Sequence, residues 1–150
     1  MKHNRSIPPV TVIPVLVYPD VRAAVDWLTT AFGFAERTRI GESHRAQMSI
    51  GADGAIIVAD VAGERHPPQS GIVTHEIKVR VADVAAQFER ARAAGATVLE
   101  APIDRVYGER ECTVADLAGH RWQFTETLRD VRPEEYGCQT VTDWQTHSAS

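Results

Sequence analysis

Apolar residues recur at helical spacing in two places along the chain. The first stretch begins at Asp20 and ends at Gly33, and the second begins at Asp83 and ends at Gly95. An aspartate can accept hydrogen bonds from the first-turn amides of a helix, and a glycine commonly ends one. The pattern predicts two amphipathic helices, with buried stripes formed by Val21, Ala24, Val25, Leu28 and Phe32 in the first and by Val84, Phe88 and Ala91 in the second.

Segments of alternating or β-branched residues flank both helices and predict strands. One precedes each helix, at residues 11–18 and 72–81. Three follow the first helix, at residues 35–40, 44–50 and 55–61, and three follow the second, at residues 97–101, 109–115 and 120–127. Turn residues at Asp53-Gly54 and from Asp116 to Gly119 predict the hairpin before the last strand of each set.

The order strand, helix, strand, strand, strand therefore occurs twice. Neither half, at about 60 residues, can bury both faces of a four-stranded sheet, so we expect the halves to pair in one α+β domain. An α+β sandwich whose halves are alike by accident is the alternative. Within the single domain 1–150, the first module covers about 11–61, a Pro- and Gly-rich linker 62–71, the second module 72–127 and a C-terminal extension 128–150.

Alternation also assigns the two faces of the predicted strands, because successive side chains point to opposite sides. Apolar residues such as Ile77, Val79 and Trp122 are expected to face the helices. Such a pattern leaves the other face either open to solvent or lining a curved cleft, and periodicity alone favours the solvated face. That face is polar in three strands: Glu76, Lys78 and Arg80; Arg121, Gln123 and Thr125; and Arg45, Gln47 and Ser49.

Composition narrows the class of protein. The 150 residues are 43% hydrophobic and 24% charged with a net charge of −4, values typical of globular proteins rather than disordered ones. The sequence has no run of ~20 apolar residues, no apolar signal-peptide core and no excess of basic residues. We therefore expect a cytoplasmic globular protein that binds neither membranes nor nucleic acids.

The two cysteines, Cys112 and Cys138, form neither a CxxC pair nor a Cys/His cluster. This excludes zinc-ribbon and thioredoxin-like sites. Disulfides are rare in the cytoplasm, so we expect Cys112 to pack as a small strand residue and Cys138 to lie in an exposed tail. A disulfide between them is the alternative.

Local motifs connect the repeat to a known family. These motifs are Pro19-Asp20-Val21, Trp27, Phe32-Gly33-Phe34, Val81-Ala82-Asp83-Val84, Ala94-Gly95-Ala96, Tyr107-Gly108-Glu109-Arg110 and the stretch from Asp116 to Trp122. Over residues 12–135 the chain resembles the vicinal oxygen chelate superfamily of glyoxalase I, bleomycin-resistance proteins and extradiol dioxygenases, in its uncharacterised glyoxalase-related branch. The resemblance implies a U-shaped cleft lined by the polar face and often completed by a second subunit, so that a homodimer is expected.

The resemblance also implies four metal-equivalent positions, one in the first and one in the last strand of each module. Aligning the two halves places them at Ile13, Val58, Glu76 and Gln123. Only Glu76 and Gln123 offer an oxygen donor. With two protein ligands, a divalent cation would have to take most of its coordination from water. We therefore expect no cofactor and no tight metal site, a divalent metal being the alternative. A slip of one residue would bring in His75 but would turn the apolar side of its strand into the cleft.

Glu76 is the candidate catalytic residue. A carboxylate in a partly apolar cleft has a raised pKa unless a cation pairs with it, and it could then act as a general base. The alternatives are an ion pair with Lys78 or Arg121, or a solvated acid at the cleft rim. His75 is expected on the helix side and His120 in a hairpin. The candidate ligand-binding residues are Gln47, Lys78, Tyr107, Arg110, Arg121, Gln123 and Thr125, of which Tyr107 and Arg110 either cap the cleft or pack a turn.

Two classes of function fit these residues. The first is a homodimeric binding module that holds a small, oxygen-rich or anionic organic molecule without a metal, since binding needs only a concave surface with a few polar groups. The second is a lyase, isomerase or dioxygenase that uses Glu76 as base or an atypical metal site. The sequence shows no exposed amphipathic stripe that would favour a protein-interaction domain. The tail after Glu135 either wraps a neighbour or frays, and Trp144 favours packing.

Overall fold

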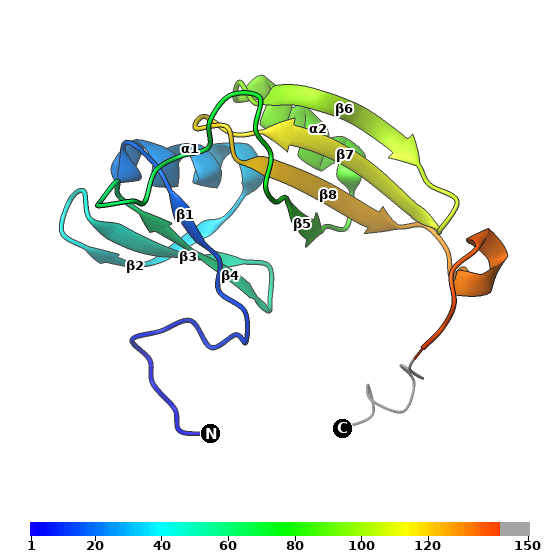
Figure 1. The fold of residues 1–150 in the computed structure, drawn as a ribbon, viewed down its shortest axis with the longest axis horizontal. Helices are drawn as coiled ribbons and strands as arrows, with labels where there is room; N and C mark the ends of the chain where they lie inside the picture. Colours follow the sequence, from blue (N-terminus) through cyan, green and yellow to red (C-terminus); the bar gives the residue numbers. More distant parts are fainter. Residues whose placement is uncertain (142–150) are drawn as a thin grey trace.

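The computed structural model describes residues 1–141 and contains two four-stranded mixed sheets with one helix packed on each (Figure 1). In sheet one, β1 is parallel to β4, and β4, β3 and β2 pair antiparallel. Sheet two repeats this arrangement with β5, β8, β7 and β6. The predicted α+β fold of two repeated modules is confirmed. The strands are β1 (Val15–Val17), β2 (Ala35–Ile40), β3 (Arg45–Ile50), β4 (Gly54–Ala59), β5 (Ile77–Arg80), β6 (Thr97–Asp104), β7 (Glu109–Ala115) and β8 (Arg121–Thr127).

Both helices begin where the sequence predicts. The side chain of Asp20 accepts a hydrogen bond from the backbone N–H of Ala23 at the start of α1 (Val21–Phe32), and Asp83 accepts one from Ala86 at the start of α2 (Val84–Ala93), each at 3.0 Å. The first helix ends at Gly33, whose φ of 78° is the left-handed conformation that glycine adopts without steric cost. A short 3-10 helix, η1 (Pro133–Tyr136), follows sheet two.

Each helix also receives a cap from the other. Trp27 lies seven residues after Asp20, and Arg90 lies seven residues after Asp83. The indole N–H of Trp27 donates to the carbonyl of Ala94 at 2.8 Å, at the end of α2. Arg90 donates to the carbonyls of Thr29 and Thr30 at 3.0 and 2.7 Å, at the end of α1. Equivalent positions of the repeat thus donate hydrogen bonds to carbonyls at the end of the opposite helix.

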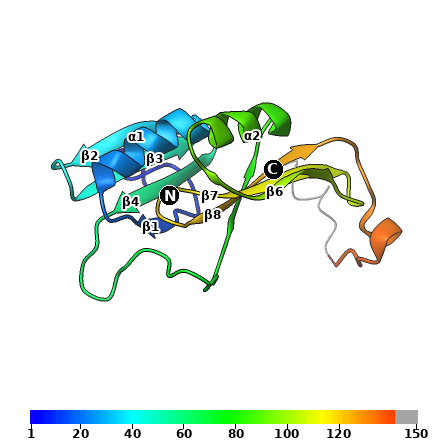
Figure 2. The same ribbon diagram turned by 90° about the horizontal axis from the view of Figure 1, so that it is seen from above.

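The helices cover the same side of the two sheets, which leaves the opposite side, here called the open face, to the polar residues (Figure 2). Val79 is buried whereas its neighbours Lys78 and Arg80 are exposed. Trp122 and Phe124 are likewise fully buried on the helix side. The predicted division of these strands into an apolar and a polar face is confirmed. The helices of the described residues are too short to form an apolar membrane span.

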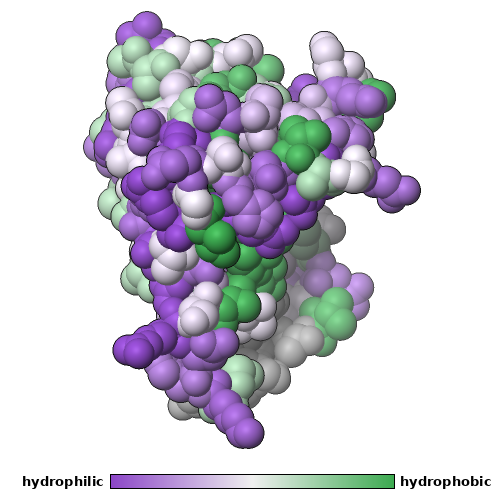
Figure 3. Space-filling model, turned by 90° about the vertical axis from the view of Figure 1, so that its left-hand side faces the viewer, coloured by the Kyte–Doolittle hydropathy of each residue, from purple (hydrophilic) through white to green (hydrophobic). Residues whose placement is uncertain are grey.

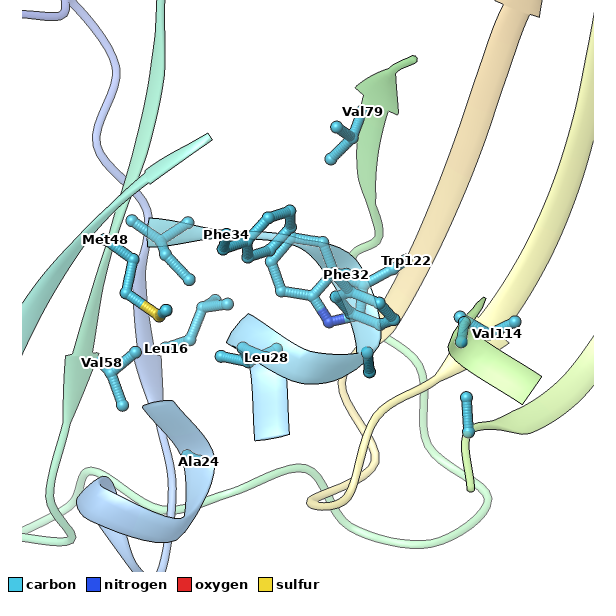
Figure 4. Close-up of a cluster of buried hydrophobic side chains, with 14 of the residues drawn as sticks. Leu16, Ala24, Leu28, Phe32, Phe34, Met48, Val58, Val79, Val114 and Trp122 are labelled. Atoms are coloured by element: carbon cyan, nitrogen blue, oxygen red, sulfur yellow. The ribbon is translucent and has the colours of Figure 1, made fainter. Parts of the chain in front are cut away.

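An aromatic cluster fills the space between the modules (Figure 4). Phe32, at the end of α1, contacts Trp122 and Phe124 of β8 edge to face, with ring centroids 5.5 and 4.9 Å apart. Phe34 adds a second contact to Trp122 at 5.3 Å. Each such pair adds about 0.5–1.5 kcal/mol to the stabilisation from burial, so the modules share one core.

A buried carboxylate joins the modules beside this cluster. One oxygen of Asp116, in the turn between β7 and β8, accepts hydrogen bonds from the hydroxyl of Tyr18 at 2.5 Å and the indole N–H of Trp122 at 3.0 Å. The other oxygen accepts the backbone N–H groups of Ala118 and His120, each at 3.0 Å. Burial, together with the charge of Asp116, raises the pKa of Tyr18 well above its usual range, so the hydroxyl stays a donor.

The strands before the helices are shorter than predicted. β1 begins only after Pro14, which has no N–H to donate to a ladder. β5 begins at Ile77, which pairs with Trp122, the second residue of β8. Residues 72–76 extend the linker instead.

The two predicted hairpin turns differ in length. Ile50 pairs with Gly54, so the first turn consists of residues 51–53 and Gly54 belongs to the strand. Ala115 pairs with Arg121, so the second turn consists of residues 116–120. The prediction that Asp53-Gly54 forms the first turn was therefore wrong by one residue, and this shifts the alignment of the last strands.

The cysteines lie as predicted. Cys112 is buried in β7 and Cys138 is exposed, and both are free thiols. Burial raises the pKa of the Cys112 thiol to about 11, so it stays protonated at neutral pH and packs as an apolar residue. Trp144 lies outside the described residues.

Replacing Tyr18 by Phe should lower the free energy of unfolding by about 1–2 kcal/mol, because Asp116 then loses one of its buried donors. Urea denaturation followed by circular dichroism measures this loss. Tyr136→Phe is the matched control, since that tyrosine is exposed and its change should cost under about 0.5 kcal/mol. Equal stabilities of the two variants would show that the Tyr18 hydroxyl contributes nothing.

Candidate functional site

A buried carboxylate also lies on the open face of sheet two. Glu111, in β7, is fully buried. Its Oε1 accepts hydrogen bonds from the Tyr107 hydroxyl and, at 3.3 Å, from the Nε of Arg105. Its Oε2 lies 3.0 Å from the Nζ of Lys78 on β5. We call Lys78, Arg105, Tyr107 and Glu111 the Glu111 cluster.

The electrostatics of the Glu111 cluster keep its acid ionised. Burial opposes ionisation of Glu111, but the hydrogen bonds from Tyr107 and Lys78 and the nearby positive charges outweigh it and hold the pKa of the carboxyl below its ordinary value. Burial and the same hydrogen bond raise the pKa of Tyr107 to about 12, which keeps its hydroxyl protonated. The cluster is therefore a carboxylate held between donors.

The turn before β7 positions Tyr107. The backbone N–H of Arg105 donates to the carbonyl of Glu109 at 2.7 Å, and Gly108 adopts a φ of 86°. A Cβ at Gly108 would lie only 2.4 Å from the carbonyl oxygen of Arg129, so only glycine allows the C-terminal extension to approach this closely. The ring of Tyr136 in that extension packs against Tyr107, with centroids 5.8 Å apart.

Two more of the predicted ligand-binding residues lie next to this cluster. Gln123 pairs with Lys78 in the sheet and donates to Thr113 at 3.5 Å, a long hydrogen bond that leaves its amide largely free. Thr125 faces the same side, but it is buried and donates to Glu109 at 2.8 Å. Lys78 is half exposed, with its ammonium 5.9 Å from the centre of the Tyr107 ring.

A groove of about 390 Å³ runs beside the cluster, between the modules. One wall is the turn between β3 and β4 and the other is β5, from which Lys78 and Arg80 line it. Seen from the end that carries sheet one, the surface is mostly hydrophilic with a narrow strip of apolar side chains (Figure 3). The groove combines charged side chains such as Lys78 and Arg80 with apolar ones such as Ile77 and Val79, as small-molecule sites do.

Gln47 lies apart from the Glu111 cluster, on the open face of sheet one. Its side chain accepts a hydrogen bond from Arg37 and donates to the backbone carbonyl of Ser6 at 2.9 Å. Arg37 in turn donates to the carbonyl of Arg5. The N-terminal segment therefore lies over Gln47 and already uses its hydrogen-bonding groups.

Arg110 faces the helix side instead of the open face. It pairs with Glu126 across the sheet, and Glu126 accepts a hydrogen bond from the backbone N–H of Val84 at the start of α2. The guanidinium of Arg110 donates to Asp104 at 2.7 and 3.2 Å. Alternation within β7 turns Arg110 away from Glu111, so the structure does not bring it into the Glu111 cluster, and its role in ligand binding stays a prediction.

The alignment of metal-equivalent positions needs one correction. Val58 is fully buried in the core against α1, and the open-face residue of β4 is Ile57, which pairs with Val15 as Gln123 pairs with Lys78. The unequal turns described above caused this error. The corrected position is aliphatic too, so the count of oxygen donors is unchanged.

Glu76 and His75 both lie in the linker before β5 and are exposed. The burial that would make Glu76 a general base is therefore missing, and the expected position of His75 on the helix side was wrong. His120 is buried in the turn before β8, as predicted for a hairpin residue, and its Nε2 lies 2.7 Å from the carbonyl oxygen of Val17. Arg121 lies under the linker.

Glu111 and Arg105 were missed by the sequence analysis. The signal was present in the strand at 109–115, where Cys112 and Val114 alternate with Glu109, Glu111 and Thr113. Applying alternation to this strand places Glu111 on the open face. Its burial could not be inferred, since it depends on the turn that brings Tyr107 and Arg105 over it.

Comparison with known proteins agrees with this architecture. The model of the Glyoxalase/Bleomycin resistance protein/Dioxygenase superfamily matches residues 7–124. The chain belongs to this superfamily. An uncharacterised protein of Mycobacterium bovis is 34% identical over an alignment of 131 residues that covers 81% of this chain and 86% of the relative.

Solved structures of the superfamily share the fold. TioX from Micromonospora sp. ML1 is 34% identical, with a TM-score of 0.64 over 77% of this chain and 97% of TioX. A glyoxalase/bleomycin resistance protein/dioxygenase from Nocardioides reaches the same TM-score at 20% identity, over 83% of this chain and 87% of that protein, and shows the fold alone. Within residues 1–141 of the present superfamily member, no three His, Cys, Asp or Glu side chains gather in a way that could hold a metal ion.

Replacing Glu111 by Gln should lower the free energy of unfolding by about 2 kcal/mol at pH 7, because the charged hydrogen bonds to Lys78 and Arg105 are lost. The folded-state pKa of Glu111 lies below the ordinary value of 4.5, so its contribution is complete above pH 4.5 and is lost as pH falls through the folded-state pKa. Urea denaturation from pH 7 to pH 3 should show the two proteins converging at acid pH. A difference that does not depend on pH would contradict this account.

Proposed function

We propose that this protein binds a small organic molecule on the open face of sheet two, beside the Glu111 cluster, without a protein-bound metal. The observation that supports this most is the position of Lys78. Its ammonium is held near Glu111 on one side and Tyr107 on the other, while half of the side chain remains exposed. A cation fixed in this way is organised to receive a ligand before the ligand arrives.

The chemistry of these groups favours an oxygen-rich or anionic ligand. Lys78 has three N–H donors and forms an ion pair with Glu111 at 3.0 Å, while about half of its side chain stays exposed. Gln123 lies beside it in the sheet and offers a further amide. The Tyr107 ring and the groove between the modules supply apolar surface for the body of the ligand. Binding through one cation and one amide orients a carboxylate, carbonyl or phenol oxygen toward β5.

The residues at the metal-equivalent positions support binding without a metal. Ile13 and Ile57 offer no donor atom, and Glu76 and Gln123 offer one side-chain group each. Glu111 is a buried carboxylate on the same face of sheet two, but Lys78 and Arg105 already compensate its charge. A divalent ion bound to Glu111 would have to displace both cations. Ordinary divalent-ion sites offer several free oxygen ligands, so no cation has to be displaced there.

Catalysis as a glyoxalase- or dioxygenase-like enzyme is the second candidate, and the site supports it less. Glu76 is exposed, and the pKa of Glu111 is lowered by its donors, so a carboxylate basic enough for proton abstraction is missing among the described open-face residues that we have assigned.

We also propose that the protein is a homodimer. Several large apolar side chains are exposed in the single chain, including Val12, Val15, Ile40, Val61 and Val106.

A thermal-shift screen of metabolites and antibiotics tests ligand binding. A ligand at a hundred times its dissociation constant adds ~2.7 kcal/mol to stability, which is a shift of several degrees in this size range. Lys78→Met should abolish most of the shift produced by a hit. Lys2→Met removes the other lysine of the chain, at the exposed N-terminus, and should keep it. A hit that stabilises both variants equally binds elsewhere and contradicts the proposed site.

Metal analysis tests the other half of the proposal. Protein purified without chelator should contain far less than one equivalent of Ni, Zn, Mn or Fe, because residues 1–141 provide too few open-face donors. Elemental analysis by mass spectrometry gives this ratio directly. Near-stoichiometric metal that is retained through dialysis would overturn binding without a metal and favour the enzyme.

A further inference from the structure

The linker between the modules crosses the open face of sheet two near the turn between β7 and β8. Figure 1 shows it passing this turn on its way from β4 to β5, and Figure 2 shows it on the side away from the helices. Pro68 of the linker lies within van der Waals reach of Gly119 in the turn, since a Cβ on Gly119 would lie 3.8 Å from Pro68. Arg65 holds the start of the linker by donating to the side chain of Asp60 at 3.1 Å.

Two adjoining pockets lie under the linker, with volumes of about 230 and 280 Å³. Both are lined by Pro68, Ile72 and Arg121, so Arg121 lies where they meet. Their combined volume suits a small organic molecule of the kind bound in pockets of ~300–1,000 Å³. These pockets share no residue with the Glu111 cluster.

The charge of this space is positive. None of the described residues that line either pocket is acidic, although the whole chain carries more acidic than basic residues. Arg121 is partly buried, and within residues 1–141 it forms no ion pair. His66, His75 and His120 line the first pocket around it. A planar guanidinium without a carboxylate partner is suited to bind one from a ligand, through two parallel hydrogen bonds.

The remaining lining is apolar. Ile72, Val73 and Leu99 are 58%, 49% and 42% exposed, high values for aliphatic side chains that lie side by side along a pocket. Ala115 and Ala118 complete this wall of the second pocket. An apolar body placed here would be shielded from water, while its acid group reached Arg121.

We propose that the space under the linker, here called the linker pocket, binds a small organic carboxylate with an apolar body. The carboxylate pairs with the guanidinium of Arg121, and the apolar body lies against Ile72, Val73 and Leu99. This site goes beyond the function proposed above, because it involves different residues and can be occupied whether or not a ligand lies beside Lys78.

Titration calorimetry of the full chain with octanoate as probe tests the linker pocket. Octanoate carries both chemical features, octan-1-ol lacks the charge and acetate lacks the apolar body. We expect octanoate to bind and the two comparison compounds to bind at least about tenfold more weakly, since each loses a contact of about 1.4 kcal/mol or more. Absence of octanoate binding at millimolar concentration, or equal binding of octan-1-ol, would overturn the proposal.

Two variants assign the binding to this pocket. Arg121→Gln should weaken octanoate binding at least about tenfold because it removes the charged partner. Ile72→Asp, in the exposed linker, should weaken it similarly by placing a negative charge beside the carboxylate, and it leaves the sheet untouched if Arg121→Gln fails to fold. Arg129→Gln is the matched control, since this exposed arginine lies outside both pockets. Unchanged octanoate affinity in Ile72→Asp, or an equal loss in Arg129→Gln, would show that octanoate binds elsewhere.

Discussion

The packing of the Phe32 and Phe34 rings against β8 is the interaction on which the rest of the structure depends. Each sheet has only one helix to cover it, so neither module can enclose a core by itself. The rings at the end of the first helix bring Trp122 and Phe124 of the second module into the same core. Burial of such side chains contributes about 1.5–3 kcal/mol each, so this cluster stabilises the contact between the modules by several kcal/mol.

The buried carboxylate of Asp116 fixes how the two modules are positioned at this contact. Apolar rings can slide over one another at little cost, whereas a carboxylate with four donors has one satisfied arrangement. The hydroxyl of Tyr18 is the donor that comes from the other module. The aromatic cluster therefore supplies most of the affinity between modules, and Asp116 fixes their relative position.

Placing both helices on one side determines where polar chemistry can occur. The helix side is closed by the shared core, so ligands can reach only the open face, the groove between the modules and the space under the linker. On that side the charged residues are arranged in two different ways. Around Glu111 the cations and the acid compensate each other, while around Arg121 the described lining offers no acid at all.

The sequence was sufficient for the modules, the helix caps and most strand faces, because these depend on local periodicity and on residues such as Asp20 and Asp83. It was insufficient wherever two distant segments had to be compared or brought together. The unequal turns misplaced Val58, and Glu76 lies in the linker because β5 begins one residue later, at Ile77. The burial of Glu111 and the pocket around Arg121 both depend on turns and linkers whose paths no local pattern specifies.

The reciprocal contacts of Trp27 and Arg90 show how the repeat works as a whole. The two residues occupy the same position in their helices, and each reaches the end of the opposite helix, so an approximate two-fold axis passes between α1 and α2. The amino acids have diverged from indole to guanidinium, yet the task of satisfying the neighbour's last carbonyls is preserved. Contacts related by such an axis do not depend on the order of the modules in the chain. A circular permutant with the second module ahead of the first would therefore retain these reciprocal contacts.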